Sequence, residues 1–299
     1  MKKTLKKQIT IGYKLLLLVL VYLGTISLSM AQEEDQEKKS DKPARPAFES
    51  TWWFDGQTGT VYSEKTLEFV IQHRFGLINS GNRDLLGIYG ASNIRLGLAY
   101  TPLKNLSVGF GYTKFKKIFD LNAKYAILNQ TRSNSMPLSL TYYVNMGIEL
   151  LDEENYLNST DRLNYFHELI LMRRFSPKFS AQVAGLYSHY NAVKWQQQDG
   201  EWQTMENDTW GISIGARLKV SSQVILMAGY DQPLTNHAIN QPKPSINLGV
   251  EIATSSHAFQ IFVTNSNKIQ PQENLMFNQN DYSNGDWLIG FNITRLWGF

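Results

Sequence analysis

Histidine, serine and carboxylate side chains are the residues of this 299-residue chain that could catalyse a reaction or bind a metal ion. Ser188 and His189 are adjacent, as are His167 and Glu168, so in a strand the members of each pair would point to opposite faces. No two histidines have the His-x-x-x-His spacing of a helical zinc site, and the chain has no cysteine. We therefore predict no catalytic residue, no metal, no cofactor and no enzyme activity.

A set of charged residues is more informative, because its members fall at alternate positions of segments whose other positions are apolar. A charge on the inner face of a closed barrel must be hydrated or paired. If water fills the lumen, the set selects solutes by charge; if Glu68 or Glu251 pairs with Arg74, Arg95 or Arg217, it forms an internal polar core. The candidate lumen-lining residues are Glu68, Arg74, Arg95, Lys124, Glu168, Arg217 and Glu251.

Segments of about ten residues with a period of two must position these charges. In residues 210–220, for example, apolar side chains alternate with Gly, Ser, Arg and Lys. Strands of this length, apolar outside and polar inside, are typical of transmembrane barrels. The predicted fold is all-β: a transmembrane up-and-down antiparallel β-barrel of about twelve strands. The predicted strands are 66–75, 93–101, 106–114, 118–128, 137–147, 163–174, 179–190, 209–220, 223–231, 245–253, 258–264 and 286–296.

The connections between these strands alternate between short and long, and only residues 115–117 depart from the rule. Outer-membrane barrels have short periplasmic turns and long external loops, with both termini in the periplasm. A soluble sandwich has no reason for this alternation. The pattern therefore predicts the outer membrane of a Gram-negative bacterium, with the loop residues 274–284 outside the cell as a solvated or partner-binding surface.

The first 65 residues do not share the alternating pattern. Lysines precede the apolar run 15–23, and Ser29, Met30 and Ala31 offer small residues for cleavage, so residues 1–31 are predicted to be a signal peptide. Residues 32–47 read as a disordered charged tether. Residues 48–65, with Trp52 and Trp53, form an N-terminal segment that is either a plug or a periplasmic cap. Residues 66–299 form the barrel.

Overall composition agrees with a folded barrel and excludes a disordered polyelectrolyte and a helical membrane bundle. The chain is 42% hydrophobic and 18% charged, with a mean hydropathy of −0.30. Residues 1–31 hold five Lys and no acid, so the remainder has 24 basic and 26 acidic side chains and a net charge of −2. Basicity therefore gives no support to nucleic-acid binding. Trp297 and Phe299 close the last strand as a candidate signal for the barrel-assembly machinery, and lipid is the expected surroundings.

Several segments together resemble one family. They are residues 66–76 (TLEFVIQHRFG), 87–90 (GIYG), 93–97 (NIRLG), 230–234 (YDQPL), 241–244 (QPKP), 249–254 (GVEIAT), 257–262 (HAFQIF) and 290–297 (GFNITRLW). In this order they resemble the Bacteroidota outer-membrane β-barrel family catalogued as domain of unknown function 5777, over roughly residues 48–299. The resemblance implies a fold and a location, and it supplies no activity or site residue.

Passage of small hydrophilic solutes through a porin-like lumen is the favoured functional hypothesis, because the inward-facing positions of the predicted strands carry charged side chains. Neutralising Arg74 and Arg95 should then change ion selectivity. A non-conducting structural or adhesive barrel, which binds a protein or glycan through its external loops, is the alternative. An outer-membrane lipid hydrolase is a second alternative, which would hydrolyse lipid as a purified protein.

Overall fold

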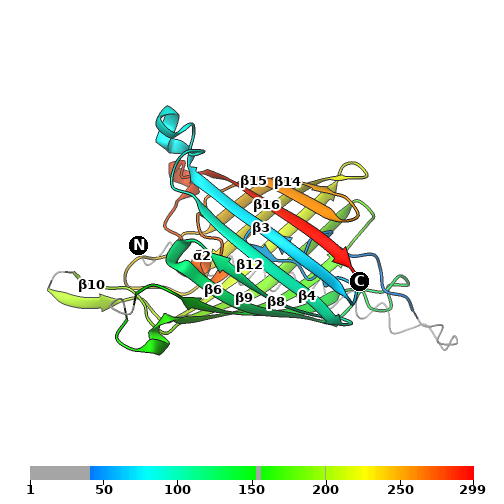
Figure 1. Cartoon of the computed structure of the whole chain (residues 1–299), viewed down its shortest axis with the longest axis horizontal. Coiled ribbons are helices and arrows are strands. Elements are labelled where there is room, and N and C mark those ends of the chain that lie inside the picture. The colour runs from blue at the N-terminus through cyan, green and yellow to red at the C-terminus, as the bar shows by residue number, and fades with distance from the viewer. Residues whose placement is uncertain (1–40, 153–155, 199) are drawn as a thin grey trace, which may run out of the picture. The chain divides into compact units, whose positions relative to one another are not determined.

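Twelve antiparallel strands close into a barrel in the computed structural model, which describes residues 41–152, 156–198 and 200–299 (Figure 1). The predicted signal peptide and residues 32–40 of the predicted tether lie outside the described residues. The barrel strands are β3 (Thr66–Leu77), β4 (Asn93–Leu103), β5 (Leu106–Thr113), β6 (Ile118–Leu128), β7 (Ser139–Glu149), β8 (Leu163–Arg174), β9 (Phe179–Tyr190), β12 (Asp208–Lys219), β13 (Val224–Pro233), β14 (Ser245–Ala253), β15 (His257–Thr264) and β16 (Leu288–Gly298).

Each barrel strand pairs with the next barrel strand along the chain, and β16 pairs with β3 to close the ring. Between β9 and β12 the chain forms a separate hairpin of β10 (Trp195–Gln198) and β11 (Glu201–Thr204), which projects from the barrel (Figure 1). Closure removes the two unpaired edges that an open sheet would expose, as a membrane requires. The predicted fold class, an up-and-down barrel of twelve strands, is confirmed.

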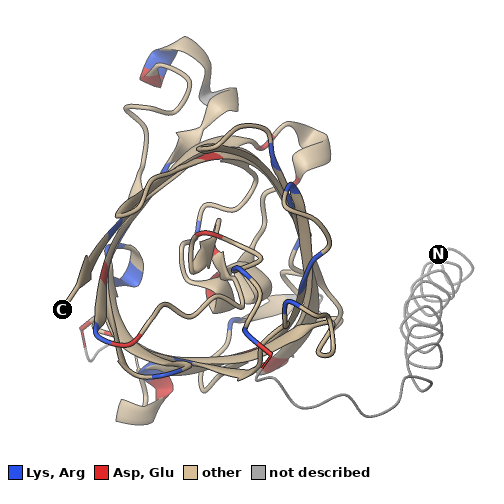
Figure 2. Ribbon diagram, turned by 90° about the vertical axis from the view of Figure 1, so that its right-hand side faces the viewer, with Lys and Arg blue, Asp and Glu red and all other residues tan. Residues whose placement is uncertain are grey.

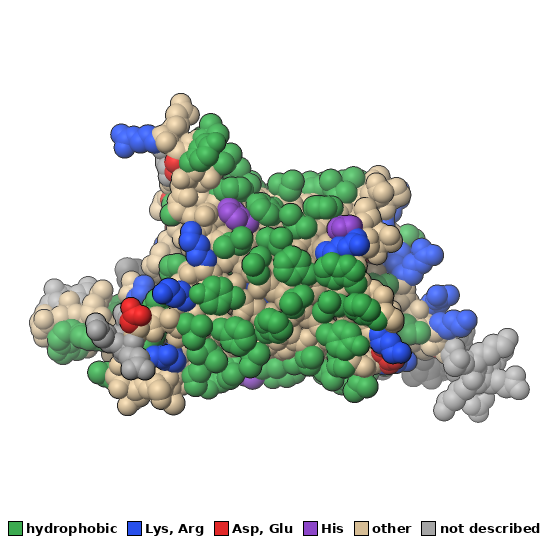
Figure 3. Space-filling view, in the orientation of Figure 1, with side chains coloured by type: hydrophobic (Ala, Val, Ile, Leu, Met, Phe, Trp, Pro, Cys, Tyr) green, Lys and Arg blue, Asp and Glu red, His purple; other side chains and the backbone are tan. Residues whose placement is uncertain are grey.

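Side-chain alternation gives the wall an apolar outside and a polar inside. Along β12 the inward Thr209, Ser213 and Arg217 are buried, whereas the outward Trp210 and Ile214 are 60% and 53% exposed. Such exposure is costly in water but favourable in lipid. Figure 3 shows the outward side chains as a continuous hydrophobic band, with Lys and Arg gathered towards its two ends.

The two ends of the barrel differ in their connections. At the end that we call the short-turn end, strands are joined by short turns such as residues 175–178 and 220–223. At the long-loop end lie the longer connections, with the short 3₁₀ helices η1 (Ile78–Asp84), η2 (Phe115–Lys117), η4 (Ser159–Arg162) and η5 (Tyr282–Asn284). None of the helices in the described ranges is long and apolar enough to cross a membrane.

Two segments enter the barrel from opposite ends, and Figure 2 shows backbone lying inside the ring of strands. The N-terminal insert, residues 42–65, contains the hairpin of β1 (Trp52–Trp53) and β2 (Gly56–Gln57). Both ends of this insert are tied to the short-turn end, where Ala44 N donates to Gln130 O (2.7 Å) and Lys65 N to Thr101 O (2.8 Å). The loop insert, residues 265–287, contains the helix α2 (Pro271–Phe277) and connects β15 to β16 at the long-loop end.

Candidate functional site

The seven candidate lumen residues lie on inward positions of the wall, and none is more than 5% exposed. They come from β3 (Glu68, Arg74), β4 (Arg95), β6 (Lys124), β8 (Glu168), β12 (Arg217) and β14 (Glu251). Because these strands are spread around the ring, the seven do not form one cluster. What they share is the N-terminal insert, which passes between them.

Ion pairs hold the N-terminal insert to the wall at two levels. Near the tip of its hairpin, Asp55 pairs with Arg74, whose Nε donates to Asp55 Oδ1 at 2.9 Å. Closer to the short-turn end, Glu49 accepts from Arg217 Nη1 and Lys219 Nζ, both at 3.2 Å. The side chains of Arg74 and Asp55 are 0% and 6% exposed. Loss of one partner from an ion pair buried this deeply strongly destabilises the folded structure, because the other charge stays buried without a counter-charge.

Wall side chains also satisfy the backbone of the N-terminal insert. Lys124 Nζ donates to the carbonyls of Thr51 and Thr58, both at 3.0 Å. The carbonyls of Trp52, Phe54, Gln57 and Gly59 accept from side chains of β15, β16, β9 and β7. A short insert has few partners of its own, so buried backbone groups must find them in the wall.

Two more of the candidate residues accept hydroxyl hydrogen bonds from the N-terminal insert. Glu68 accepts from Thr51 Oγ1, and Glu251 accepts from Ser50 Oγ at 2.6 Å. Glu168 lines a small cavity beside Asp55. The wall therefore presents both cations and carboxylates to this insert, and Arg74, Arg217, Lys124, Glu68 and Glu251 each bond a complementary group of it.

The sequence suggested ion pairs across the lumen between Glu68 or Glu251 and an arginine of the wall, and this suggestion is wrong. Neither Glu68 nor Glu251 pairs with an arginine of the wall in the described structure. Arg95 instead binds Asp120 of β6, which is the second strand along the ring from β4, through Nε and Nη2, at 2.9 and 2.7 Å. The physical reason is that the insert separates the facing sides of the lumen, so long side chains meet it before they meet one another.

An aromatic cluster adds apolar contact to the polar attachment. Phe48, Trp53 and Phe54 pack in edge-to-face pairs, with ring centroids 4.8 and 5.1 Å apart. Phe54 also packs edge-to-face on Phe262 of β15 at 5.0 Å. The guanidinium of Arg95 lies over the ring of Trp52 at 4.9 Å, which is a favourable cation–π geometry.

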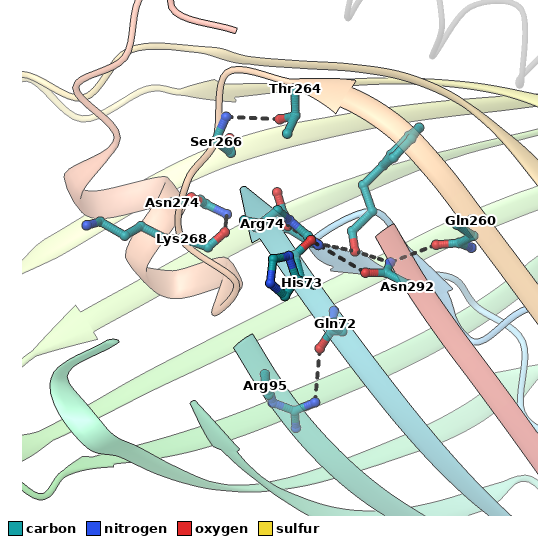
Figure 4. A network of polar contacts seen from close by, with 12 residues as sticks. Gln72, His73, Arg74, Arg95, Gln260, Thr264, Ser266, Lys268, Asn274 and Asn292 are labelled. Atoms are coloured by element: carbon teal, nitrogen blue, oxygen red, sulfur yellow. Dashed lines mark hydrogen bonds and ion pairs between the residues drawn. The ribbon is translucent and has the colours of Figure 1, made fainter. Parts of the chain in front are cut away.

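The loop insert is attached chiefly by neutral amide groups. Gln270 Nε2, just before α2, donates to Asp120 Oδ2 (2.8 Å) and to Thr113 Oγ1 (3.0 Å). Gln272 Nε2 donates to Asn145 Oδ1 at 2.8 Å. Helix α2 packs against β8, β9, β12 and β13, and Figure 4 shows its Asn274 bonded to the carbonyl of Lys268, at 2.9 Å.

One ionic cluster surrounds the buried Glu273 of α2. The carboxylate of Glu273 is fully buried and lies 3.4 Å from Lys116 Nζ of η2, which also contacts Glu149 at 2.8 Å. Burial raises the pKa of Glu273, although Lys116 and Lys268 act to lower it. Burial lowers the pKa of Lys116, but the carboxylates of Glu273 and Glu149 outweigh burial, so its pKa is raised overall.

The position of residues 274–284 corrects the prediction of a solvated external loop. Asn274 and Met276 are 7% and 0% exposed, since α2 turns into the mouth of the barrel. Asp286, predicted to begin the last strand, instead precedes it and accepts from Asn79 Nδ2 at 2.9 Å. Sequence reasoning missed α2; Pro271 at its first turn was the available signal.

Two cavities between the inserts and the wall inside the barrel are small in this conformation. One cavity, lined by Glu68, Arg95 and Lys124 among others, has about 20 Å³. A second, between Gly56 of the N-terminal insert and Leu275 of the loop insert, has about 30 Å³. These volumes correspond to roughly one or two water molecules, whereas small-molecule sites span roughly 300–1,000 Å³. Neither of these two cavities can hold a small solute in this conformation.

Fold and lumen together define a membrane-spanning β-barrel with a polar interior that two segments of its own chain occupy. Residues 48–297 match the family model described as a membrane-bound β-barrel domain (DUF5777). The chain belongs to this family. A search of curated proteins found no match to it.

Solved structures with a similar fold include several outer-membrane proteins. The NanC porin has 9% identity and a TM-score of 0.47, with 78% of this chain and 99% of that chain covered. An outer-membrane channel from Pseudomonas putida F1 has 10% identity and a TM-score of 0.49, covering 80% and 97%. The KdgM porin has 8% identity and a TM-score of 0.42, covering 78% and 99%.

Proposed function

We propose that the protein is a gated outer-membrane passage for small hydrophilic solutes, which its two inserts close in the conformation described. The observation that carries this proposal is the choice of partners in the lumen. Arg74 and Arg217 pair with Asp55 and Glu49 of the N-terminal insert, and Lys124 binds its backbone. When that insert withdraws, these charges face water and line a hydrated channel, in keeping with ion selection by charged walls.

The short-turn end faces the periplasm in this proposal, because short turns are periplasmic in outer-membrane barrels. Both termini of the mature chain then lie in the periplasm, and the N-terminal insert acts from that side. The loop insert acts from outside the cell. Trp297 and Phe299, 38% and 77% exposed at the end of β16, remain candidates for the signal that the assembly machinery reads.

Ion selectivity of the open form depends on which wall charges lack a partner within the wall. Arg95 stays neutralised by Asp120, whereas Arg74 loses Asp55 when the insert leaves. We therefore expect Arg74→Gln to shift selectivity towards cations, whereas replacement of the whole neutral pair, Arg95→Gln with Asp120→Asn, should leave selectivity nearly unchanged. Equal shifts in the two variants, or none in Arg74→Gln, would contradict this assignment of the lumen field.

Conductance in planar bilayers tests the passage itself. The mature chain from residue 32 should be silent for most of the time, and a variant that begins at Thr66 should show more frequent steps. A variant that also has residues 267–280 replaced by a short linker should conduct steadily. Silence of this double deletion, with the folded barrel confirmed by its heat-modifiable migration, would overturn the proposal.

A disulfide lock supplies the matched control in the full-length protein. A Cβ added at Gly59 would lie 3.1 Å from Thr141 Oγ1 on β7, within the reach of an S–S bond. Since the chain has no other cysteine, Gly59→Cys with Thr141→Cys should form a single bridge. We expect oxidation to suppress opening and reduction to restore it. The conductance of either single variant should not depend on the redox state.

Binding through the loops is the second candidate function, favoured by an aromatic pair outside the lumen. Trp195 and Trp202 on the β10–β11 hairpin are 64% and 62% exposed, with rings 4.7 Å apart edge-to-face. Exposed tryptophans are typical of binding hot spots. If the protein adheres to a glycan or protein, replacing both with alanine should abolish retention on the partner and leave conductance unchanged.

A further inference from the structure

Four arginines surround one cavity at the short-turn end of the barrel. The cavity has about 520 Å³, the largest volume among the cavities described above. Arg45 comes from the N-terminal insert, Arg132 from the turn between β6 and β7, and Arg173 and Arg174 from the end of β8. None of the described residues that line it is acidic. We call this space the arginine cavity.

The four guanidinium groups have few partners. In the described ranges none of them takes part in an ion pair. Arg132 Nε donates to the carbonyl of Pro43 at 3.3 Å, and Arg174 Nη1 donates to that of Pro46 at 3.5 Å. Arg173 Nε is hidden from solvent and has no hydrogen-bond partner there. Four like charges facing one space repel each other, and an anion within it would relieve that repulsion.

One edge of the arginine cavity lies where the outward apolar row of β8 ends. Arg173 continues the outward row of Leu169 and Leu171 on β8, two residues or roughly 7 Å beyond Leu171. Phe175 and Phe179 beside it are 57% and 41% exposed, and Arg173 lies over the ring of Phe175 at 5.2 Å. Aromatic and basic side chains at the end of an apolar row mark the headgroup level.

We propose that the arginine cavity binds the phosphate headgroup of an anionic phospholipid from the leaflet at the short-turn end. Guanidinium groups bind phosphate oxygens in pairs of parallel hydrogen bonds, and basic pockets at this depth suit anionic headgroups. The outward position of Arg173 and Phe175 favours a lipid over a soluble anion, since its acyl chains can follow the apolar row. This proposal is independent of whether the lumen conducts.

The bound headgroup would also join the N-terminal insert to the wall. Arg45 belongs to the insert, whose residues 42–46 run beside the β6–β7 turn, where Arg132 N donates to Lys42 O at 3.0 Å. A phosphate that contacts Arg45 and Arg132 together bridges the two segments. Lipid binding therefore stabilises the docked insert.

Native mass spectrometry of the full mature protein in detergent, with added phosphatidylglycerol or phosphatidylcholine, tests the proposal. Arg132→Gln with Arg173→Gln should weaken retention of phosphatidylglycerol about tenfold or more, and the corresponding lysine variant should retain part of it. The matched control, Arg83→Gln with Lys178→Gln, loses the same charge outside the cavity and should bind as the native protein does. Heat-modifiable migration checks that each variant is folded.

Three outcomes would overturn the proposal. Equal loss in the cavity and control variants would show a diffuse charge effect. Displacement of phosphatidylglycerol by millimolar inorganic phosphate would show a site for a free anion. Appearance of lipid binding solely after deletion of residues 32–40 would show that the acidic run of this chain, which includes Glu33, Glu34 and Glu37, occupies the cavity.

Discussion

Replacing Asp55 with asparagine should release the N-terminal insert from the barrel wall. The substitution keeps the size of the side chain but leaves the buried guanidinium of Arg74 without its anion. Breaking a buried ion pair in this way costs roughly 3–5 kcal/mol. Arg74 still donates to Phe54 O (3.2 Å) and to Asn292 Oδ1 (3.1 Å), so we expect the lower value. About 3 kcal/mol corresponds to a rise of about a hundredfold in the undocked population.

A single cysteine at Ala47 can report this change, since Ala47 is 4% exposed in the docked insert and the chain has no cysteine of its own. When docking is faster than labelling, the rate of reaction with a water-soluble maleimide follows the undocked population. We expect about a hundredfold faster labelling for Asp55→Asn by the argument above. Glu64→Gln, which alters an exposed carboxylate at the same end, should change the rate by less than about threefold.

The double variant Asp55→Asn with Arg74→Gln separates a lost attraction from a stranded charge. If the cost arises from the unpaired buried cation, neutralising Arg74 as well should restore slower labelling. Labelling of Asp55→Asn that stays within about threefold of the parent, or a double variant that labels faster than Asp55→Asn, would refute the view that this pair holds the insert.

Two further predictions concern other contacts of the lumen. A Cβ at Gly111 would overlap the guanidinium of Arg95, so Gly111→Ala should lower the free energy of unfolding in urea by roughly 1–3 kcal/mol. A Cβ at Gly185 would meet nothing within 4 Å, so Gly185→Ala should leave that free energy unchanged. Burial raises the pKa of Glu273 above its ordinary 4.5, so the inserted form binds a proton more tightly than the withdrawn form. Insertion should therefore be strongest at low pH and weaken as pH rises from about 4.5 through the raised pKa, and Glu273→Gln should remove this part of the pH dependence of opening in the variant that begins at Thr66.

The strands could be predicted from the sequence because each of them must present apolar side chains to lipid at every second position. Predicted bounds agree with β6, β8, β9 and β14 at both ends. Where they differ, a local group decides: the prediction began β7 at Pro137, which has no N–H to donate, and the strand begins at Ser139, whose hydroxyl accepts from Gln130 N. Period-two alternation fixes the faces of a strand, and turn chemistry fixes its end.

The contents of the lumen could not be derived in the same way. The alternation along the strand predicts that Arg74 points inward, but any carboxylate inside the barrel could pair with its guanidinium. The actual partner, Asp55, lies in a segment that has no alternating pattern. The helix α2 has seven residues, too few to leave a periodic signal, and its Gln and Asn side chains read as a loop. Polar partners are chosen by three-dimensional proximity, which alternation along the chain does not encode.

The two inserts differ in what holds them, and this gives the passage two separate controls. Ion pairs with the wall hold the N-terminal insert, whereas hydrogen bonds from the amide groups of Gln270 and Gln272 hold the loop insert. If each insert is withdrawn about 1% of the time, a typical minor-state population, both are out about 0.01% of the time.

Deleting either insert should then raise the open probability about a hundredfold, and deleting both should multiply the two gains if they act independently. The small cavity between Gly56 and Leu275 is lined by both inserts, so they face each other across it in the closed lumen. If each insert braces the other, the first deletion also loosens the remaining insert. The second deletion would then give a smaller gain than the first, and the product rule would fail in that direction.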